Sequence, residues 1–322
     1  MSRPQRVLIA ILTYRRLEQL AGLLPELIDQ IDTEGPVVRM LVVDNDPMGG
    51  ASVVAESFAA AGVEYLHEPR PGIAAARNAA LTAAAKFDAL IFIDDDERPT
   101  PGWLSSMIAV YRGTDCAAVV GPVISEFGGK PDAFVGAGSF FSRRRLVTGT
   151  VVEVAATNNL MLDMVRVRAW GLSFDEAFGL SGGSDTLFTA ELVNHGGKMI
   201  WCDEALVIDR VPADRLHKKW VMRRAFRSGN SRSRVDLHVA SSPVNRLVVR
   251  LRRSAAGILR AAVGGVNLAL GLMTRSMSRQ ARGARTLARG LGMATGAWGY
   301  VYEEYQRLGP TTTGTSPSEV CG

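Results

Sequence analysis

The sequence predicts an α/β fold, a doubly wound and mostly parallel sheet flanked by helices, with a helical, basic C-terminal extension. Through the first 120 residues, short apolar runs alternate with longer helical patterns, which is typical of a parallel sheet. After residue 215 the pattern is helical and rich in arginine. A chain of 322 residues with 47% hydrophobic side chains can bury a sizeable core, which excludes a disordered tail, a collagen and a disulfide-stapled small domain.

The expected elements follow one another in a regular order. The apolar runs predict strands over residues 7–12, 37–43, 63–66 and 89–93, and the segments between them predict helices over 17–31, 51–61 and 73–85. Farther along, we expect a mobile glycine-rich segment over 128–138, a strand over 151–155, a helix over 186–195, two short strands within 198–209, helices from 215 to 308 and a disordered tail over 310–322. Ligands of such sheets bind beyond the carboxyl ends of the strands.

The formal charge of +5 conceals a division of the chain. Residues 1–209 hold 17 basic and 27 acidic side chains, a net charge of −10, whereas residues 210–307 hold 20 basic and 4 acidic ones, a net charge of +16. The cysteines are Cys116, Cys202 and Cys321, widely spaced and odd in number, so we expect neither a disulfide framework nor a zinc site. The run 7–12 is too short for the core of a signal peptide, which favours the cytoplasm.

Polar side chains follow three of the predicted strands. Thr13, Tyr14 and Arg15 follow the first, Asp44 begins a polar turn after the second, and four acids, 94–97, follow the fourth. Four adjacent carboxylates repel one another unless a cation is present, and carboxylate oxygens suit Mg²⁺ or Mn²⁺ rather than zinc. The alternative is a solvated loop of helix-capping acids.

These motifs, in this order, resemble the family 2 glycosyltransferases of the GT-A fold. The resemblance rests on Thr13-Tyr14-Arg15, Val42-Val43-Asp44-Asn45, the stretch 72–78 and Phe92-Ile93-Asp94-Asp95-Asp96, and it covers about residues 6–230. It implies a nucleotide-sugar donor, usually UDP-linked, held through Mn²⁺ or Mg²⁺ by a DxD-type motif. By this resemblance Asp94 and Asp96 form the DxD pair and ligate the metal.

The resemblance also implies roles for other residues. Asp44 matches the acid that binds the uracil imide, and Arg77 the arginine beside the base and the diphosphate; a turn-forming acid and an exposed helix charge are the alternatives. Asn158 and Asn159 fall near the donor sugar, and the segment 215–230 is similar to a tryptophan–arginine helix facing the diphosphate. The residues expected to bind the donor are therefore Thr13, Tyr14, Arg15, Asp44, Arg77, Asp94, Asp95, Asn159, Trp220, Arg223, Arg224 and Arg227.

The stretch 180–185 resembles the family's glycine-glycine-glutamate-aspartate turn, whose second acid is the general base. By this resemblance Asp185 takes the proton of the acceptor hydroxyl, although it could instead only cap the helix that follows. The sequence departs from the family at Ser184, where glutamate is usual. It also lacks the histidine that many relatives carry near residues 207–212, where Asp209 either replaces it or is structural.

The basic third contains two arginine clusters, each followed by an uncharged run, of 14 residues over 261–274 and 13 over 290–302. Such runs are shorter than the roughly 20 residues that span a bilayer and suit amphipathic helices on an anionic membrane surface. Residues 254–274 contain one charge, which leaves a marginal membrane-spanning or re-entrant helix open. Packing against the rest of the chain or a homodimer partner is the other alternative, and the absence of a known nucleic-acid motif disfavours nucleic acid.

Together these patterns predict three regions and one activity. The regions are a GT-A catalytic domain over 1–230, a basic helical, membrane-associating region over 231–309 and the tail 310–322. The activity is inverting, metal-dependent transfer of a hexose from a UDP-sugar to a hydroxyl of a lipid-linked or oligosaccharide acceptor at the cytoplasmic face of the membrane. The alternative is a non-catalytic protein that binds a nucleotide-sugar or a nucleic acid through a vestigial acidic loop.

Overall fold

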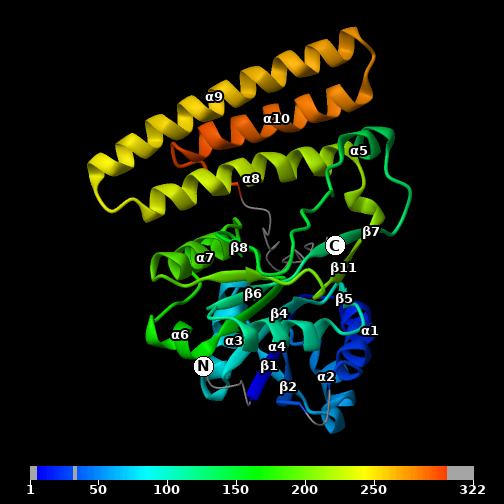
Figure 1. Ribbon diagram of the computed structural model, residues 1–322. Coiled ribbons are helices and arrows are strands. Elements are labelled where there is room, and N and C mark those ends of the chain that lie inside the picture. The colour runs from blue at the N-terminus through cyan, green and yellow to red at the C-terminus, as the bar shows by residue number, and fades with distance from the viewer. Residues whose placement is uncertain (1–5, 32–34, 303–322) are drawn as a thin grey trace, which may run out of the picture.

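A computed structural model describes residues 6–31 and 35–302, and its centre is an eight-stranded sheet (Figure 1). The strand order is β3-β2-β1-β4-β9-β6-β10-β8. The expected tail, 310–322, lies outside the described residues. The strands are β1 (Arg6–Thr13), β2 (Val37–Asp44), β3 (Val63–His67), β4 (Ala89–Asp94), β6 (Ala118–Val120), β8 (Val151–Val152), β9 (Asn159–Asp163) and β10 (Met199–Trp201).

The first four strands form the parallel part of the sheet, as the sequence predicts. In their register Thr13 of β1 lies opposite Asp44 of β2, and Leu12 lies opposite Asp94 of β4, so the carboxyl ends of three strands meet at one edge. Strand β9 runs antiparallel between β4 and β6, and β8 runs antiparallel to β10. The expected strand over 151–155 is therefore only the two residues of β8.

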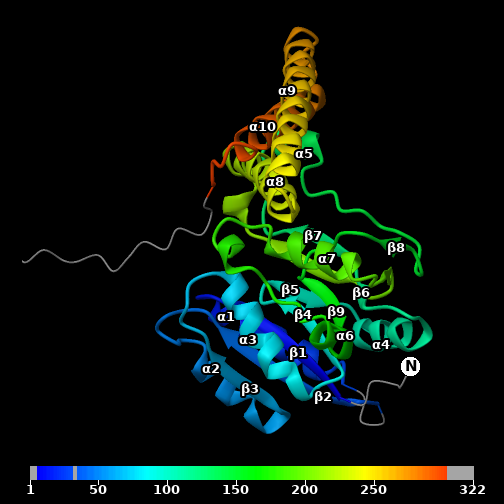
Figure 2. The same cartoon turned by 90° about the vertical axis from the view of Figure 1, so that its left-hand side faces the viewer.

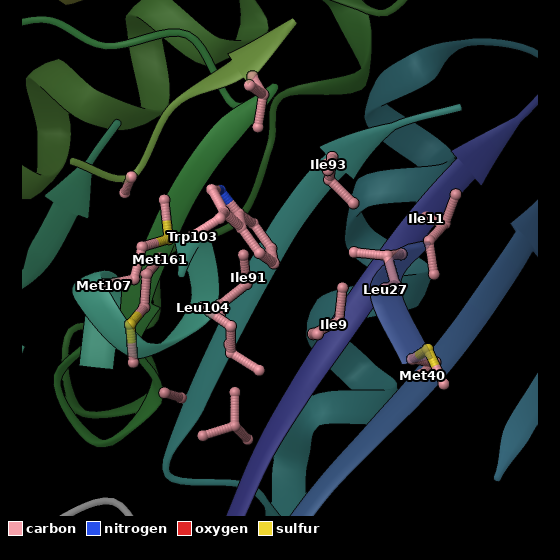
Figure 3. Packing of buried hydrophobic residues seen from close by; sticks show 14 of the residues in the cluster. Ile9, Ile11, Leu27, Met40, Ile91, Ile93, Trp103, Leu104, Met107 and Met161 are labelled. Carbon is pink, nitrogen blue, oxygen red and sulfur yellow. The ribbon is translucent and has the colours of Figure 1, made fainter. Parts of the chain in front are cut away.

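Helices cover both faces of the sheet, which confirms the doubly wound prediction. Along β1, alternate residues point to opposite faces: Ile9 and Ile11 belong to one buried cluster, and Leu8 and Ala10 to the other. Figure 3 shows Ile9 and Ile11 in the first cluster with Leu27, Met40, Ile91 and Trp103. The helices of this body are α1 (Leu17–Ile28), α2 (Ser52–Ser57), α3 (Ile73–Ala83), α4 (Trp103–Gly113), α6 (Met164–Ala169) and α7 (Ser184–Asn194).

A second, three-stranded sheet begins within the acidic turn, at Glu97. Its order is β5 (Glu97–Pro99), β11 (Val207–Val211) and β7 (Val123–Phe127), and Glu97 lies opposite Asp209. The glycine-rich segment 128–138 is not the mobile loop that composition suggests. It contains helix α5 (Ala133–Gly138), because the Asp132 carboxylate caps the helix at Val135 N and also accepts from Lys218 N.

Three long helices form a layer on one side of this body, α8 (Lys218–Val239), α9 (Pro243–Met273) and α10 (Met277–Gly296) (Figures 1 and 2). Glycines hold α9 and α10 together, since a Cβ on Gly264 would lie 2.3 Å from Leu287 N and one on Gly290 would lie 2.5 Å from Ala261 N. Gly257, Gly264 and Gly271 recur every seven residues, so glycines line one face of α9 over its C-terminal half. Because α8 crosses residue 230, the expected boundary between regions falls inside a helix.

Candidate active site

A cavity of about 820 Å³ lies at the edge where the carboxyl ends of the parallel strands meet. Its walls come from these strand ends, from the turn before α7, from β11 and from α8, so the helical layer covers the edge of the sheet. Most of the residues predicted to form the site line this cavity: Thr13, Tyr14, Arg15, Arg77, Asp94, Asp95, Asp96, Asp185, Trp220, Arg224 and Arg227. Asp44, Asn159 and Arg223 are not among them.

The acidic turn after β4 is tied to the end of β1. Asp95 accepts from Thr13 Oγ1 at 2.8 Å and from Arg16 Nη1 at 2.8 Å, and the same Arg16 nitrogen donates to Asp96 Oδ2 at 2.7 Å. Burial alone would lower the pKa of Arg16, but the charges of Asp95 and Asp96 outweigh it and raise this pKa. Sequence reasoning missed Arg16, although it directly follows the predicted Thr13-Tyr14-Arg15.

Crowding and burial raise the pKa values of two carboxyl groups in the acidic turn. Burial, followed by the neighbouring charge of Asp96, raises the pKa of Asp94 to about 7, and burial with the charge of Asp94 raises the pKa of Glu97 well above its usual range. A divalent cation would relieve this repulsion, and the all-oxygen donor set of Asp94 and Asp96 fits Mn²⁺ or Mg²⁺. Residues 6–31 and 35–302 contain no group of three or more His, Cys, Asp or Glu side chains placed to hold a metal.

Asp209, the candidate replacement for the missing histidine, also lines the cavity. Its carboxylate lies 3.1 Å from Arg143 Nη2, so it is an ion-pair partner in this structure. His217 is exposed and caps α8 by accepting from Trp220 N at 3.2 Å. The structure therefore gives His217 a local role away from the acidic turn.

Asp185 occupies the first turn of α7, after two glycines in left-handed conformations. Gly182 and Gly183 have φ values of 76° and 107°, which side chains other than glycine rarely adopt. One carboxylate oxygen of Asp185 accepts from Thr186 N at 2.7 Å. The Ser184 hydroxyl accepts a hydrogen bond from Arg77 Nη1 at 2.9 Å. This bond joins α3 to the turn that carries Asp185.

Helix α8 contributes aromatic and cationic side chains to the opposite wall. Trp220 stacks on Phe141, with ring centroids 5.8 Å apart, and the Arg224 guanidinium lies over both rings, 5.2 Å from the centroid of Trp220. Burial, followed by the charges of Arg143 and Arg227, lowers the pKa of Arg224 to about 10. The wall thus carries excess positive charge, which a phosphate group would neutralise.

Two predicted residues have other roles in the structure. The Asp44 carboxylate is almost fully buried and accepts from Asp46 N, Ala51 N and Tyr65 OH. Both of its oxygens are therefore already hydrogen-bonded to the following loop and to strand β3. The Asn159 amide is buried in β9, where it accepts from Trp103 Nε1 and donates to the carbonyls of residues 122 and 205. Both Asn158 and Asn159 are expected near the donor sugar; packing occupies the polar atoms of Asn159, which corrects its assignment, whereas Asn158 lines the cavity.

The cavity wall contains a buried hydroxyl that sequence reasoning did not single out. Thr157 is 1% exposed, and its Oγ1 has no hydrogen-bond partner among the described residues. An unpaired buried hydroxyl is unfavourable, so a polar ligand atom in the cavity would satisfy it. The only sequence signal was its position directly before Asn158 and Asn159. Arg143 and Arg215 also line the cavity without having been predicted.

An acidic turn at the ends of parallel strands faces an acid at a helix start across a cavity rich in arginine, which is the arrangement expected of a GT-A glycosyltransferase. The profile of the family "Glycosyl transferase family 2" matches residues 8–165. The chain is also 32% identical over 230 residues to the succinoglycan biosynthesis protein ExoM of Rhizobium meliloti, covering 70% of this chain and 74% of that one. The chain belongs to glycosyltransferase family 2, and the predicted class of enzyme is confirmed.

Solved structures of low sequence identity share the fold. The mannosyltransferase PcManGT of Pyrobaculum calidifontis, in complex with GDP-Man and Mn²⁺, matches with a TM-score of 0.57 at 16% identity over 89% of this chain and 86% of its own. S. aureus TarS 1-349, in complex with UDP-GlcNAc, matches with a TM-score of 0.51 at 15% identity, over 87% of this chain and 90% of its own. GalNAc-T7 with UDP, GalNAc and Mn²⁺ matches with a TM-score of 0.55 at 13% identity over 73% of this chain. The match covers about half, 48%, of the GalNAc-T7 chain.

Proposed function

We propose that the chain is an inverting, metal-dependent glycosyltransferase that moves a hexose from a UDP-sugar to a hydroxyl of a polyprenyl-linked glycan. The observation that carries this proposal is that the acidic turn and Asp185 face one cavity, with Arg77 between them. Arg77 donates to Ser184, next to Asp185, and its charge opposes the rise in the pKa of Asp94. The GDP-Man and Mn²⁺ bound to PcManGT, the UDP, GalNAc and Mn²⁺ bound to GalNAc-T7, and the succinoglycan biosynthesis named for ExoM support the same reaction class.

In this reaction the Asp185 carboxylate takes the proton of the acceptor hydroxyl as its oxygen attacks the anomeric carbon. A bond forms between that oxygen and the anomeric carbon, and the bond from this carbon to the diphosphate breaks, with its electron pair leaving on UDP. Attack from the face opposite the diphosphate inverts the anomeric configuration. A divalent cation held by Asp94 and Asp96 would neutralise charge on the diphosphate, to which Arg77, Arg224 and Arg227 add fixed positive charge.

The direct test measures UDP or GDP release from a panel of nucleotide-sugars with Mn²⁺ and a glycan acceptor. We expect turnover with a UDP-sugar, abolished in Asp96→Ala and lowered by a factor of about 10²–10⁴ in Asp185→Asn, with a product of inverted configuration by NMR. Asp203→Asn is the control, because Asp203 pairs with Arg145 and does not line the cavity. Undiminished turnover in Asp185→Asn would refute its role as base, and release from GDP-mannose alone would refute the UDP assignment.

We propose further that α9 lies on an anionic membrane. Its glycine face packs on α10, so its other face is exposed and apolar; among the described residues it is the one helix long and apolar enough to cross a membrane, and 17% of that stretch is buried. Arginines lie along the same helix, and cations beside an apolar face are attracted to anionic lipid. The exposed apolar residues of α9 include Val244, Leu247, Val248, Leu251, Ile258, Leu259, Val263, Val266 and Leu270.

Flotation with liposomes tests the membrane proposal. We expect the protein to float with vesicles containing anionic lipid, less with neutral vesicles, and less after Leu259→Asp, which places a charge on the exposed face. Arg282→Gln on α10 controls for a general loss of one charge. Failure of the full chain to float at low salt, together with sedimentation as a dimer, would assign the apolar face to a second copy of the chain and refute the proposal.

A further inference from the structure

A second compartment of about 460 Å³ opens beside Asp185. It shares Arg77, Asp94, Asp185, Arg224 and Arg227 with the first cavity, so the two meet where the proposed base lies. Its remaining polar walls have a different character, because they are built from arginine and hydroxyl side chains. They are Ser184, Thr186, Ser228, Ser231, Arg232 and Arg289.

The positive charge of this compartment exceeds the negative charge beside it. Burial, followed by the charges of Arg260, Arg285 and Arg232, lowers the pKa of Arg289. Across residues 6–31 and 35–302, no carboxylate lies within ion-pair distance of Arg289. The Nε of Arg232 lies 3.5 Å from Asp236, but that carboxylate also contacts Arg253. Neighbouring cationic side chains repel one another and lower one another's pKa, and a bound anion relieves this repulsion.

The packing of the helical layer brings Arg289 to this position. A Cβ on Gly229 of α8 would lie 2.1 Å from the carbonyl oxygen of Arg289, and one on Gly292 of α10 would lie 2.0 Å from that of Phe226. The backbones of α8 and α10 therefore touch beside the compartment. The start of α7, where Ser184 and Thr186 lie, adds the positive end of a helix dipole to the same wall.

We infer that this compartment is an acceptor subsite that binds a phosphate group of the acceptor through Arg232 and Arg289. The inference rests on the proposed function, because Asp185 as base places the acceptor hydroxyl at the junction of the two cavities. Guanidinium groups and hydroxyls beside a helix start are the ligands that recognise phosphate oxygens. The bound group comes either from a lipid phosphate or from free phosphate, and these two sources are separable by experiment.

The test is a calorimetric titration of the full chain with farnesyl phosphate, and separately with inorganic phosphate, at saturating UDP and Mn²⁺. We expect Arg289→Gln and Arg232→Gln each to weaken farnesyl phosphate binding at least about tenfold, as for a lost charge-assisted hydrogen bond. The affinity of Arg289→Lys for farnesyl phosphate should lie between those of the wild type and Arg289→Gln. Arg282 is exposed and lies outside both cavities, so Arg282→Gln should bind farnesyl phosphate as the wild type does. The Kd for UDP should change less than twofold in every variant.

Tighter binding of farnesyl phosphate than of inorganic phosphate would assign the site to a lipid phosphate, and equal binding would assign it to phosphate alone. Unchanged affinity in both arginine variants, or no phosphate binding once UDP is bound, would overturn the inference. The readout needs no turnover. A chain that binds farnesyl phosphate through Arg232 and Arg289 but transfers no sugar would refute the proposed function and leave a phosphate site, whereas transfer with unchanged farnesyl phosphate affinity would refute the subsite alone.

Discussion

The buried hydroxyl of Thr157 offers a test in which stability and affinity change in opposite directions. Thr157 is 1% exposed, lines the main cavity and has no hydrogen-bond partner among the described residues. The substitution Thr157→Val keeps the branched shape and replaces the hydroxyl with a methyl group. It therefore removes the unpaired polar atom without opening a cavity.

The magnitudes follow from the cost of an unpaired polar group. Burying a hydroxyl without a partner costs about 1–3 kcal/mol, so Thr157→Val should raise the free energy of unfolding of the ligand-free protein by about 1 kcal/mol. If the hydroxyl bonds the donor when the cavity is filled, losing that bond costs about 0.5–1.5 kcal/mol. At about 1.4 kcal/mol per factor of ten, donor affinity should fall about 2- to 12-fold.

Urea unfolding of the ligand-free chain and titration with the UDP-sugar measure the two quantities. Thr100→Val is the matched control, because Thr100 Oγ1 donates to the carbonyl oxygen of Leu206 at 3.0 Å and does not line the cavity. The control should lose about 1 kcal/mol of stability and keep its donor affinity. A Thr157→Val protein that is less stable than wild type and binds the donor equally well would refute the reasoning.

Three further changes test the site and the helical layer. Asp185→Asn should lower kcat by a factor of about 10²–10⁴ in a transfer assay while the Kd for the donor stays within about twofold, and a matching fall in donor affinity would argue for a binding role instead. Chelation of divalent cations should remove the rise in Tm that UDP causes in the wild type, and Asp96→Asn should show a smaller rise even with Mn²⁺; equal shifts in both proteins would exclude Asp96 as a ligand. Gly264→Ala should destabilise the chain by about 1–3 kcal/mol in urea, because its Cβ would lie 2.3 Å from Leu287 N, whereas Gly265→Ala, with open space around its Cβ, should be neutral or stabilising; equal effects would contradict the close packing of α9 on α10.

The strands of the parallel half could be predicted because each is an apolar run bounded by polar residues. Strand β9 was missed because its apolar run is only three residues long, 160–162, too short to predict a strand, although it pairs with both β4 and β6. Asn159 begins this buried strand and accepts from Trp103 Nε1, whereas Asn158 lies in the turn before the strand and lines the cavity. Two adjacent asparagines do not show by themselves which of them faces the cavity.

Residues that line the cavity could be predicted where a short local motif contains them, and not where they depend on contacts across the fold. Asp94, Asp96 and Asp185 follow from local patterns. Arg16 reaches the acidic turn across about 80 positions of sequence, and Arg289 reaches the second compartment only because Gly229 lets α10 touch α8. The apolar run of α9 was read as a candidate membrane surface, but the seven-residue glycine spacing within it was not read as helix packing.

The division of charge along the chain has a physical consequence inside the cavity. The N-terminal body supplies Asp94, whose pKa is raised by burial and the charge of Asp96, and the basic third supplies Arg224, whose pKa is lowered by burial and by Arg143 and Arg227. If these carboxylates paired directly with these guanidiniums, the pKa of Asp94 would fall and the pKa of Arg224 would rise. Arg215 does approach Asp96, at 3.7 Å, but across residues 6–31 and 35–302 neither Asp94 nor Arg224 has an ion-pair partner, and both line the cavity, so the repulsion on each persists. A ligand that brings a cation to the carboxylates and a diphosphate to the guanidiniums relieves both, which neither the cation nor the anion does alone.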